Sequence, residues 1–477
     1  MPSNRRVSSS RYQPRASAAI RNIDVLSTTF LHQLRSALLP LSVVVLCALP
    51  ARAADLLQTY RDALASDAAY ASARATRDAG LESLPQGLAQ ILPTLNATAF
   101  TQHNDIDISF GGPAPNSSTR QGNSNGYTVT LTQPLFNWQN VQVYKEAGFK
   151  AAQAEATFGQ ATQDLIVRVA QAYFDVLASQ DSLAFIQAQK VAISEQLAQA
   201  KRNFEVGTAT ITDTHEAQAR FDLATSQEIA AQNDLEIKKR ALQQVIGKFP
   251  ERLESLRPNI EISPPRPDAM EDWASVAASQ SYSVRVQEAA LEIALREIER
   301  TRAGHLPTLN LVGSSGVNSS SISATAVNNT PSDSTTRIIG LQLALPLYSG
   351  GNVNSLVRQA VANREKAQQD LESSRRVAAL SARQAYLGVT NGRAQVKALE
   401  AALVSSRSAL DSNKLGYEVG VRINIDVLNA QQQVFSTLRD LSRARYDTIL
   451  NGLKLKAAAG SLGEVDVEEV NRLLGTN

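Results

Sequence analysis

Apolar side chains recur along this chain at two spacings. Over long stretches they return every third or fourth residue, as in Ile166, Val169, Tyr173 and Val176, which is the spacing of one face of an amphipathic α-helix. In four short segments every second residue is apolar, which is typical of a β-strand with one apolar face. The apolar stripes do not extend around the helices, so we expect packed helices rather than helical membrane spans.

The helices should be unusually long, because prolines, which interrupt helices, are missing from two large regions. No proline occurs between Pro134 and Pro250, and none occurs after Pro346. We predict one helix from about 140 to 205 and a second from about 353 to 418, each about 100 Å long. We expect shorter helices at 55–89, 213–246, 269–304 and 426–459. Two of them placed end to end would match one long helix in length.

The period-two segments have the signature of strands that cross a bilayer. They cover residues 94–102, 127–133, 308–317 and 339–347. In the second segment Tyr127, Val129 and Leu131 alternate with threonines, and a run of about ten residues with one apolar face suits a membrane strand. The segments at 103–125 and 318–336 are rich in Asn, Ser, Gly and Thr, so we predict long external loops there.

Prolines are expected to mark the ends of two strands. Pro134 and Pro346 follow the second strand of each pair, where a residue that cannot donate a ladder hydrogen bond is tolerated. In the first predicted helix, Pro85 and Gly87 should cause a kink near its end.

The order of elements occurs twice. LPTLN at 92–96 returns at 306–310, and FEVGTATITD at 204–213 returns as YEVGVRINID at 417–426. Each copy contains a helix, a strand, a polar loop, a strand, a very long helix, a Val-Gly break and a last helix. We therefore predict repeat 1 at 54–247, a Pro-rich equatorial linker at 248–267, repeat 2 at 268–460 and a C-terminal tail at 461–477.

Four strands are too few to stand alone in a membrane. Lipid offers no partner to the unpaired backbone groups of a sheet edge, and the smallest bacterial barrels use about eight strands. Two, three or four chains must therefore share one barrel. The predicted fold class is an α+β membrane protein, with a long α-helical coiled-coil barrel joined to a transmembrane β-barrel shared between protomers. The alternative, a soluble sandwich, would leave both hairpins without a second sheet to cover them.

The first 53 residues differ from the rest and are typical of an export signal. They contain seven arginines and one aspartate, then an apolar segment at 38–50 and a small-x-small site at 51–53. We expect cleavage near Ala53, with a transit peptide or a misassigned start codon as alternatives. Cleavage would leave 40 of 47 basic and 44 of 45 acidic side chains, which changes the net charge from +2 to −4 and argues against nucleic acid as a partner.

Cysteine and histidine give no indication of catalysis. Cys47 is the single cysteine and lies in the leader, and Leu46 stands before it where a lipid-acceptor cysteine needs a small residue. The mature chain would then have no thiol for a disulfide, a metal or catalysis. The histidines at 103, 215 and 305 are scattered, and no HExxH, GxSxG or phosphate-binding glycine loop occurs. We expect no enzymatic activity, no metal site and no cofactor.

Taken in order, the motifs resemble those of the TolC family of bacterial outer-membrane channel-tunnels. LPTLN precedes a strand twice, QPLF and LPLY follow one at 133 and 345, and QAYF and QAYL begin at 171 and 384. The resemblance covers nearly all of residues 55–460. It implies a homotrimer with twelve strands in the outer membrane, one continuous duct across the periplasm, and a belt formed by the linker and tail around the middle of the helices.

The resemblance also implies a function and partners. The chain would be the exit duct of a tripartite export system, a passive channel with an iris-like periplasmic gate that carries small toxic compounds or secreted proteins. Its partners would be a periplasmic adaptor protein and an inner-membrane pump, either an ABC or a proton-driven transporter. The missing lipid-acceptor cysteine favours the unlipidated members. The alternative is a trimeric coiled-coil surface adhesin or a structural outer-membrane protein, although adhesins keep their strands in one terminal block.

The Val-Gly breaks are expected at the tip, which is the end of the helices farthest from the strands. Gly207 and Gly420 allow the chain to reverse, and Asp213 is expected to cap the helix that follows. The positions that match the family's closing ties are Thr212, Asp213, Tyr417 and Arg422. A partly exposed tie of this kind is worth only about 1 kcal/mol, so a partner could open it.

Two further sets of residues follow from the resemblance. Asp426 matches the family's constriction aspartate, and three copies around a bore would attract cations. Asn429 stands where the family carries a second aspartate, so we expect weaker block by cations. The adaptor is expected to dock at Val206, Gly207, Val419 and Gly420, with plain turns that have no partner as the alternative.

Overall fold

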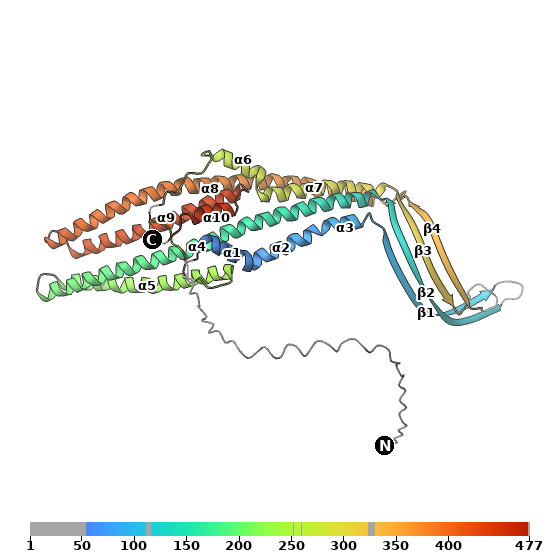
Figure 1. The fold of residues 1–477 in the computed structure, drawn as a ribbon, viewed down its shortest axis with the longest axis horizontal. Helices are drawn as coiled ribbons and strands as arrows, with labels where there is room; N and C mark the ends of the chain where they lie inside the picture. The colour runs from blue at the N-terminus through green and yellow to red at the C-terminus, as the bar shows by residue number, and fades with distance from the viewer. Residues whose placement is uncertain (1–53, 111–115, 251, 259, 323–329, 476–477) are drawn as a thin grey trace, which may run out of the picture. The chain divides into compact units, whose positions relative to one another are not determined.

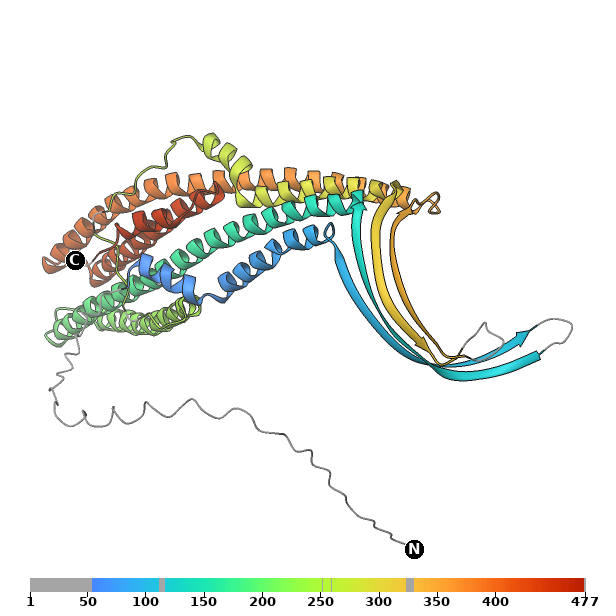
Figure 2. The ribbon, with the colours of Figure 1, turned by 45° about the vertical axis from the view of Figure 1, so that its right-hand side comes forward.

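Two helices of nearly equal length dominate the computed structural model, which describes residues 54–110, 116–250, 252–258, 260–322 and 330–475. Helix α4 (Trp138–Glu205) has 68 residues and α8 (Asn352–Glu418) has 67, both close to the predicted bounds. Helix α5 (Ile211–Ile246) runs back along α4, and α9 (Asn424–Ala458) runs back along α8 (Figures 1 and 2). Each returning helix begins two residues before its predicted start.

The remaining helices pack against α4 and α8. They lie either along the halves of these two helices nearest the strands or at mid-height. They are α1 (Leu56–Ser66), α2 (Ala68–Leu81), α3 (Ser83–Ala89), α6 (Met270–Gln280), α7 (Tyr282–Arg302), the 3-10 turn η1 (Ala303–His305) and α10 (Glu464–Asn471). Within the described ranges, no α-helix combines the length with the apolar character that a bilayer crossing would require.

The prediction of single helices at 55–89 and 269–304 was wrong, because capping residues interrupt both. The side chain of Asp67 accepts a hydrogen bond from the Tyr70 N–H, and that of Ser281 accepts one from the Val284 N–H, so each starts a new helix. The kink predicted at Pro85 is also misplaced. The break comes before it at Glu82, and Pro85 sits in the first turn of α3, where a missing N–H costs nothing.

The main apolar core lies at mid-height, where several segments meet around α4. Tyr173 is fully buried, and its hydroxyl donates to the carbonyls of Ala54 and Glu254 at 3.2 and 2.8 Å. Phe174 stacks on Tyr446 of α9 with ring centroids 5.5 Å apart. The core therefore fixes the start of the described chain, the linker and both copies to one another.

The linker and the tail lie together against the middle of the long helices. The N–H of Arg257 donates to the Leu473 carbonyl at 3.1 Å, which joins the linker to the tail. Arg393 of α8 donates to the carbonyl of Ile262 at 2.8 Å, and Arg445 of α9 donates to that of Pro258 at 3.2 Å. These contacts cover one face of the helical layer.

The four strands form one antiparallel sheet in the order β1-β2-β3-β4. Their bounds are β1 (Thr94–Phe110), β2 (Asn116–Phe136), β3 (Thr308–Ser320) and β4 (Ser332–Ala344). Each strand continues from a helical segment, so the sheet lies at the end of the helices opposite the Val-Gly breaks (Figure 1).

The strands extend beyond their predicted ends into the segments expected to be loops. Residues 103–110 and 116–125 pair with each other, because polar side chains bond across the two strands. Thr119 donates to Asp107, and Gln121 donates to Asp105 at 2.8 Å. In the second pair, β3 reaches Ser320 and β4 begins at Ser332. The rest of the predicted loops, at 111–115 and 323–329, lies outside the described residues, as does the leader at 1–53.

The prolines near the strand ends behave differently in the two copies. Pro134 lies inside β2, at a shift of register between Pro134 and Phe136, so the prediction that it ends the strand was wrong. A shift of register tolerates a residue without an N–H. Pro346 lies beyond the end of β4, which stops at Ala344, three residues before the predicted end.

The pairing register places most of the apolar side chains of the four strands on one face of the sheet. Leu95 pairs with Leu131, Leu131 with Gly313 and Gly313 with Ile339. The members of this apolar face are Leu95, Ala97, Ala99, Tyr127, Val129, Leu131, Leu309, Leu311, Val317, Ile339, Leu341 and Leu343. In the single chain Ile339 is 82% exposed and Leu341 is 66% exposed. The opposite face carries mostly threonine, asparagine, serine and glycine.

Candidate functional site

The two helical hairpins end in turns with the same backbone hydrogen bonds. The N–H of Val206 donates to the carbonyl of Arg202, and that of Val419 donates to Leu415, both at 3.1 Å. Gly207 and Gly420 follow, with φ of 80° and 77°. That left-handed conformation is easy only for glycine, so the Val-Gly pair reverses the chain in both copies.

The side chains at the start of the returning helices differ between the copies. Thr210 is the N-cap of α5 and Asp213 completes a capping box, because the Asp213 carboxylate accepts from the N–H of Thr210 at 3.1 Å. Asp213 was expected to be the cap itself, and the structure places it three residues later in the motif. Ile423 is the N-cap of α9 and provides no side-chain hydrogen bond.

The four residues expected to form gate ties have other partners within the chain. Asp213 bonds to Thr210, and the exposed Thr212 joins none of the described side-chain hydrogen bonds. Arg422, in the turn before α9, lies 3.7 Å from Asp426 in the first turn of that helix. Tyr417 accepts a hydrogen bond from the amide of Asn203 at 3.2 Å. The described contacts therefore do not join Asp213 to Arg422 inside one chain.

Other residues, which the sequence patterns did not indicate, join the two hairpins near the tip. The amide of Gln196 on α4 donates to the side-chain oxygen of Asn424 on α9 at 2.5 Å, and both side chains are buried. Arg220 on α5 donates to Asn429 at 3.0 Å and to Gln432 at 2.8 Å. Ile193, Leu197, Ala217, Ala224 and Leu428 form a small apolar cluster between the same helices. The sequence alone does not distinguish a polar helix residue that makes such a contact from one that is exposed to solvent.

The tips themselves expose apolar side chains. Val206 is 73% exposed and Val419 is 65% exposed, and Val421 and Ile423 are similarly accessible. Single exposed apolar residues are ordinary, but a group of them at one end of a protein often marks a contact with a partner. The turns at the two tips can thus offer apolar surface to another protein.

The two residues expected to form a constriction lie on one face of the first turns of α9. Asp426 is the acidic residue in the first turn, and its side chain is 35% exposed beside Arg422. Asn429 follows three residues later on the same face and is exposed apart from its bond to Arg220. The two positions therefore differ in charge and in partner.

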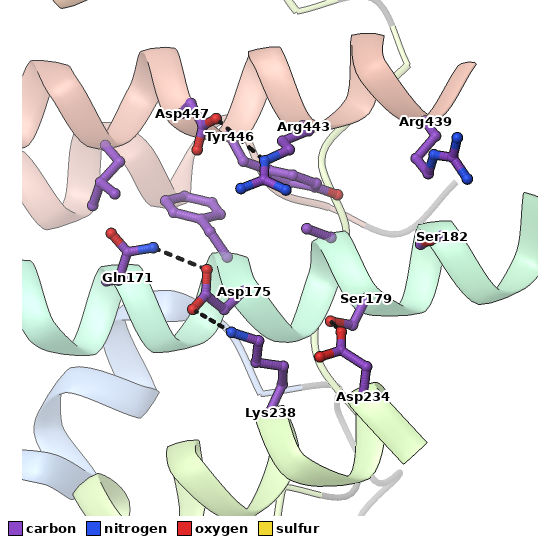
Figure 3. Close-up of a pocket in the computed structure, with 13 residues that line it drawn as sticks. Gln171, Asp175, Ser179, Ser182, Asp234, Lys238, Arg439, Arg443, Tyr446 and Asp447 are labelled. Atoms are coloured by element: carbon purple, nitrogen blue, oxygen red, sulfur yellow. Dashed lines mark hydrogen bonds and ion pairs between the residues drawn. The ribbon is translucent and has the colours of Figure 1, made fainter. Parts of the chain in front are cut away.

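A cavity of about 310 Å³ lies farther up the same helices, between α4, α5 and α9 (Figure 3). Lys238 lies 3.3 Å from Asp175, and Arg443 lies 3.7 Å from Asp447. Ser179 donates to Asp234 at 2.8 Å. The lining is rich in charge, with three acidic and three basic side chains among the residues that form it.

The buried Tyr446 lines this cavity and makes a hydrogen bond to α4. Burial, and then the negative charge of Asp181, raises the pKa of Tyr446. The hydroxyl therefore stays protonated and donates to the Asp181 carboxylate at 2.7 Å, and Ser442 donates to the same carboxylate. The contact ties α9 to α4 at mid-height.

Comparison with known proteins identifies relatives of the chain. The sequence model of the outer membrane efflux protein family matches it at residues 59–248 and again at 273–461. The outer membrane protein TolC of Vibrio cholerae is 34% identical over 420 residues, which cover 88% of this chain and 93% of that protein. The alkaline protease secretion protein AprF of Pseudomonas aeruginosa is 32% identical over 422 residues, which cover 88% and 87%.

A solved structure shares the fold. The CmeC outer membrane channel of Campylobacter jejuni superposes with a TM-score of 0.74 at 17% identity, over 88% of this chain and 90% of that chain. Long helices joined to a four-stranded antiparallel sheet are therefore the architecture of a known group of outer-membrane channels.

Proposed function

The chain belongs to the outer membrane efflux protein family, and we propose that three copies of it close one transmembrane β-barrel with four strands from each chain. It is an exit duct in the outer membrane of a bacterium, where it serves an export system. The names of its relatives favour a duct over the surface-adhesin interpretation, because they refer to efflux and secretion. The proposal concerns how the chains assemble, what they bind and how the passage is controlled.

The observation that carries the proposal is the pair of free edges on an apolar sheet. Strands β1 and β4 are outermost, and each pairs on one side only within the chain. Unpaired backbone groups cannot remain in lipid, so β4 of one chain must pair with β1 of the next. The apolar face, which includes Leu95, Leu131 and Ile339, would then face the lipid all around the barrel.

Engineered disulfides test this closure. The leader carries the one cysteine, so a mature chain cut near Ala53 offers a cysteine-free background. Ala97→Cys on β1 is combined in turn with Ile339→Cys, Leu341→Cys or Leu343→Cys on β4, all on the apolar face. Oxidation of the protein in membranes should give covalent dimers and trimers on a non-reducing gel, in at least one of the three pairs.

The matched control uses two strands of the same chain. Ala97→Cys with Val129→Cys joins residues that pair directly in β1 and β2, so oxidation should leave the mass unchanged. A protein that stays monomeric in all the β1–β4 variants, and remains soluble without detergent, would contradict a shared barrel.

The helices are proposed to continue this barrel as a duct across the periplasm. The chain would act passively, with a periplasmic adaptor and an inner-membrane pump as partners, and carry small toxic compounds or secreted proteins. The name of AprF refers to protease secretion, which supports protein cargo as one of the two classes. The cargo-selecting parts would belong to the pump, since an exit duct is generic.

The exposed apolar turns are the proposed docking site for the adaptor. Val206 and Val419 stand beside the left-handed Gly207 and Gly420, with open space around each glycine. Replacement of Val206 and Val419 by Asp should place charge in an apolar contact and abolish export while trimers still form. Export at the wild-type rate in that variant would remove the docking proposal and leave the duct intact.

The gate ties are proposed to form between neighbouring chains. Inside one chain, Arg422 and Asp213 have separate partners, but both lie in exposed turns at the same end of the helices. In a ring of six hairpins, the α8–α9 hairpin of one chain would adjoin the α4–α5 hairpin of the next. Tyr417 and Arg422 could then reach Thr212 and Asp213 across that boundary and hold the tips closed.

A further inference from the structure

We propose that Arg220 sets the charge selectivity of the constriction by offsetting its acidic residues, so that the passage discriminates only weakly between cations and anions. The inference rests on the proposed trimeric duct, because it needs three copies of Arg220 around one bore. It concerns a residue on α5, whereas the constriction residues expected from the sequence, Asp426 and Asn429, lie on α9.

The partners of Arg220 on α9 are neutral and do not offset its charge. Its guanidinium donates to the side-chain oxygens of Asn429 at 3.0 Å and of Gln432 at 2.8 Å. Both acceptors are amides, and the pair at i and i+3 lies on one face of α9. The two hydrogen bonds hold the positively charged guanidinium beside Asn429. Asn429 is the position where a second aspartate would form a second acidic ring.

Acidic side chains near this place oppose that cation. Between residues 424 and 434 the one acidic side chain is Asp426, and it lies 3.7 Å from Arg422. Glu216 lies one turn from Arg220 on α5, is exposed, and joins none of the described hydrogen bonds or ion pairs. Asp213, farther toward the tip, is held by Thr210 in the capping box. Arg220 and Arg422 therefore offset Asp426 and Glu216, and the loss of Arg220 would leave an acidic excess at the start of α9.

The face that carries Asn429 and Gln432 is the face that would line the passage. The linker and tail cover the opposite face, where Arg445 of α9 reaches Pro258. Because the belt occupies one side of the helical layer, an open bore must run along the other. Arg439 and Arg443 stand seven residues beyond Gln432 and Ser436, so the same stripe of α9 continues into the wall of the cavity (Figure 3).

The cavity itself does not determine the sign of the selectivity. Asp175 faces Lys238, and Asp447 faces Arg443. Asp234 and Arg439 complete a set of three acidic and three basic side chains. The acidic and basic side chains balance there, so the cavity gives a permeating ion no preference for either sign.

The test is the reversal potential of the purified channel in a planar bilayer under a KCl gradient. The wild type should discriminate little between chloride and potassium. Arg220→Gln keeps an amide donor and removes three charges from the ring, so the permeability ratio of chloride to potassium should fall by roughly fivefold. The difference between this variant and the wild type should shrink as salt is raised, because charges are screened within about 10 Å at 0.1 M salt.

Two further variants separate charge from structure. Arg220→Lys retains the charge with different hydrogen bonds, and should keep the wild-type ratio. Arg240→Gln removes one cation per chain from the same helix, where Arg240 pairs with Glu236, and should also leave the ratio unchanged. A ratio that Arg220→Gln leaves unchanged overturns the inference and leaves the duct standing. If the purified protein forms no channel at all, both the proposed duct and this inference are wrong.

Discussion

The turns at the ends of the two hairpins share a backbone but use their side chains differently. Residues 204–213 and 417–426 make equivalent main-chain hydrogen bonds around a left-handed glycine. In the first turn, Thr210 and Asp213 bond to each other and cap α5. In the second, Ile423 stands at the cap and provides no such bond, so Asp426 is left to face Arg422 and the solvent. One aspartate caps its own helix, and the equivalent aspartate forms an ion pair with Arg422 instead.

The difference extends to the neighbouring positions. Phe204 and Ala209 in the first turn correspond to Tyr417 and Arg422 in the second, so the second turn gains a hydroxyl and a guanidinium. The second turn thus carries polar groups that the first turn lacks. The two copies share one backbone, and where the first has a side-chain helix cap the second has the groups assigned to the proposed gate.

The largest effect is expected when the second turn loses its polar groups. Tyr417→Phe combined with Arg422→Ala should raise the conductance of a closed channel several-fold, because ties of about 1 kcal/mol each hold the tips together. Single-channel recording in planar bilayers measures the change. Arg407→Ala removes an exposed arginine from α8 that joins none of the described ion pairs, and serves as the control. Equal conductance in the double variant and the wild type would count against the gate.

A second effect concerns block of the channel by metal ions. With Asn429 in place of a second aspartate and Arg220 beside it, trivalent cations should block the wild type weakly. Asn429→Asp should strengthen the block, but only in part, since Arg220 would pair with the new carboxylate. Asn429→Asp with Arg220→Gln should strengthen it further.

Current through single channels, recorded as the metal concentration is raised, gives the block for each variant. Equal block in the wild type and in Asn429→Asp would show that position 429 does not face the passage. Equal block in Asn429→Asp with and without Arg220→Gln would instead show that Arg220 does not modulate the ring.

The sequence predicted the long helices well because their signals are local and repeated. A helix without proline and with an apolar stripe can extend for 68 residues, and the Val-Gly pair marks its end. The breaks at Asp67 and Ser281 were missed because a capping residue inside a helical pattern looks the same as a solvated polar residue. The outer parts of β1 and β2 were missed for a related reason, since side-chain bonds such as Gln121 to Asp105 stabilise strands that have no apolar alternation.

The candidate site was predictable only where a motif marked it. The turn glycines and Asp426 stand in a repeated motif, and the structure brings them to the end of the hairpins. Arg220 and Gln196 lie in stretches that repeat no motif, and their partners are more than 200 residues away. Contacts over that separation depend on how α4, α5 and α9 pack, which the sequence periodicity does not specify.

A smaller effect is expected from the cap of the first turn. Thr210→Val removes the hydroxyl that accepts from the Asp213 N–H, and should destabilise the first turn of α5 by about 1 kcal/mol. Hydrogen exchange of the amides in the first turn of α5 should become several-fold faster. Thr212→Val changes an exposed neighbour in the same turn that is not the cap, and should leave the exchange nearly unchanged.

The smallest effect is expected from the reverse exchange, which gives the second turn the cap of the first. Ile423→Thr should let Asp426 close a capping box, as Asp213 does with Thr210, and stabilise the start of α9 by a few tenths of a kcal/mol up to about 1 kcal/mol. The same change would draw the Asp426 carboxylate toward its own helix end. Block by trivalent cations should then fall by roughly twofold while exchange in the first turn of α9 slows. Slower exchange with unchanged block would mean that capping does not remove Asp426 from the bore, and the difference between the two aspartates would then rest on their neighbours alone.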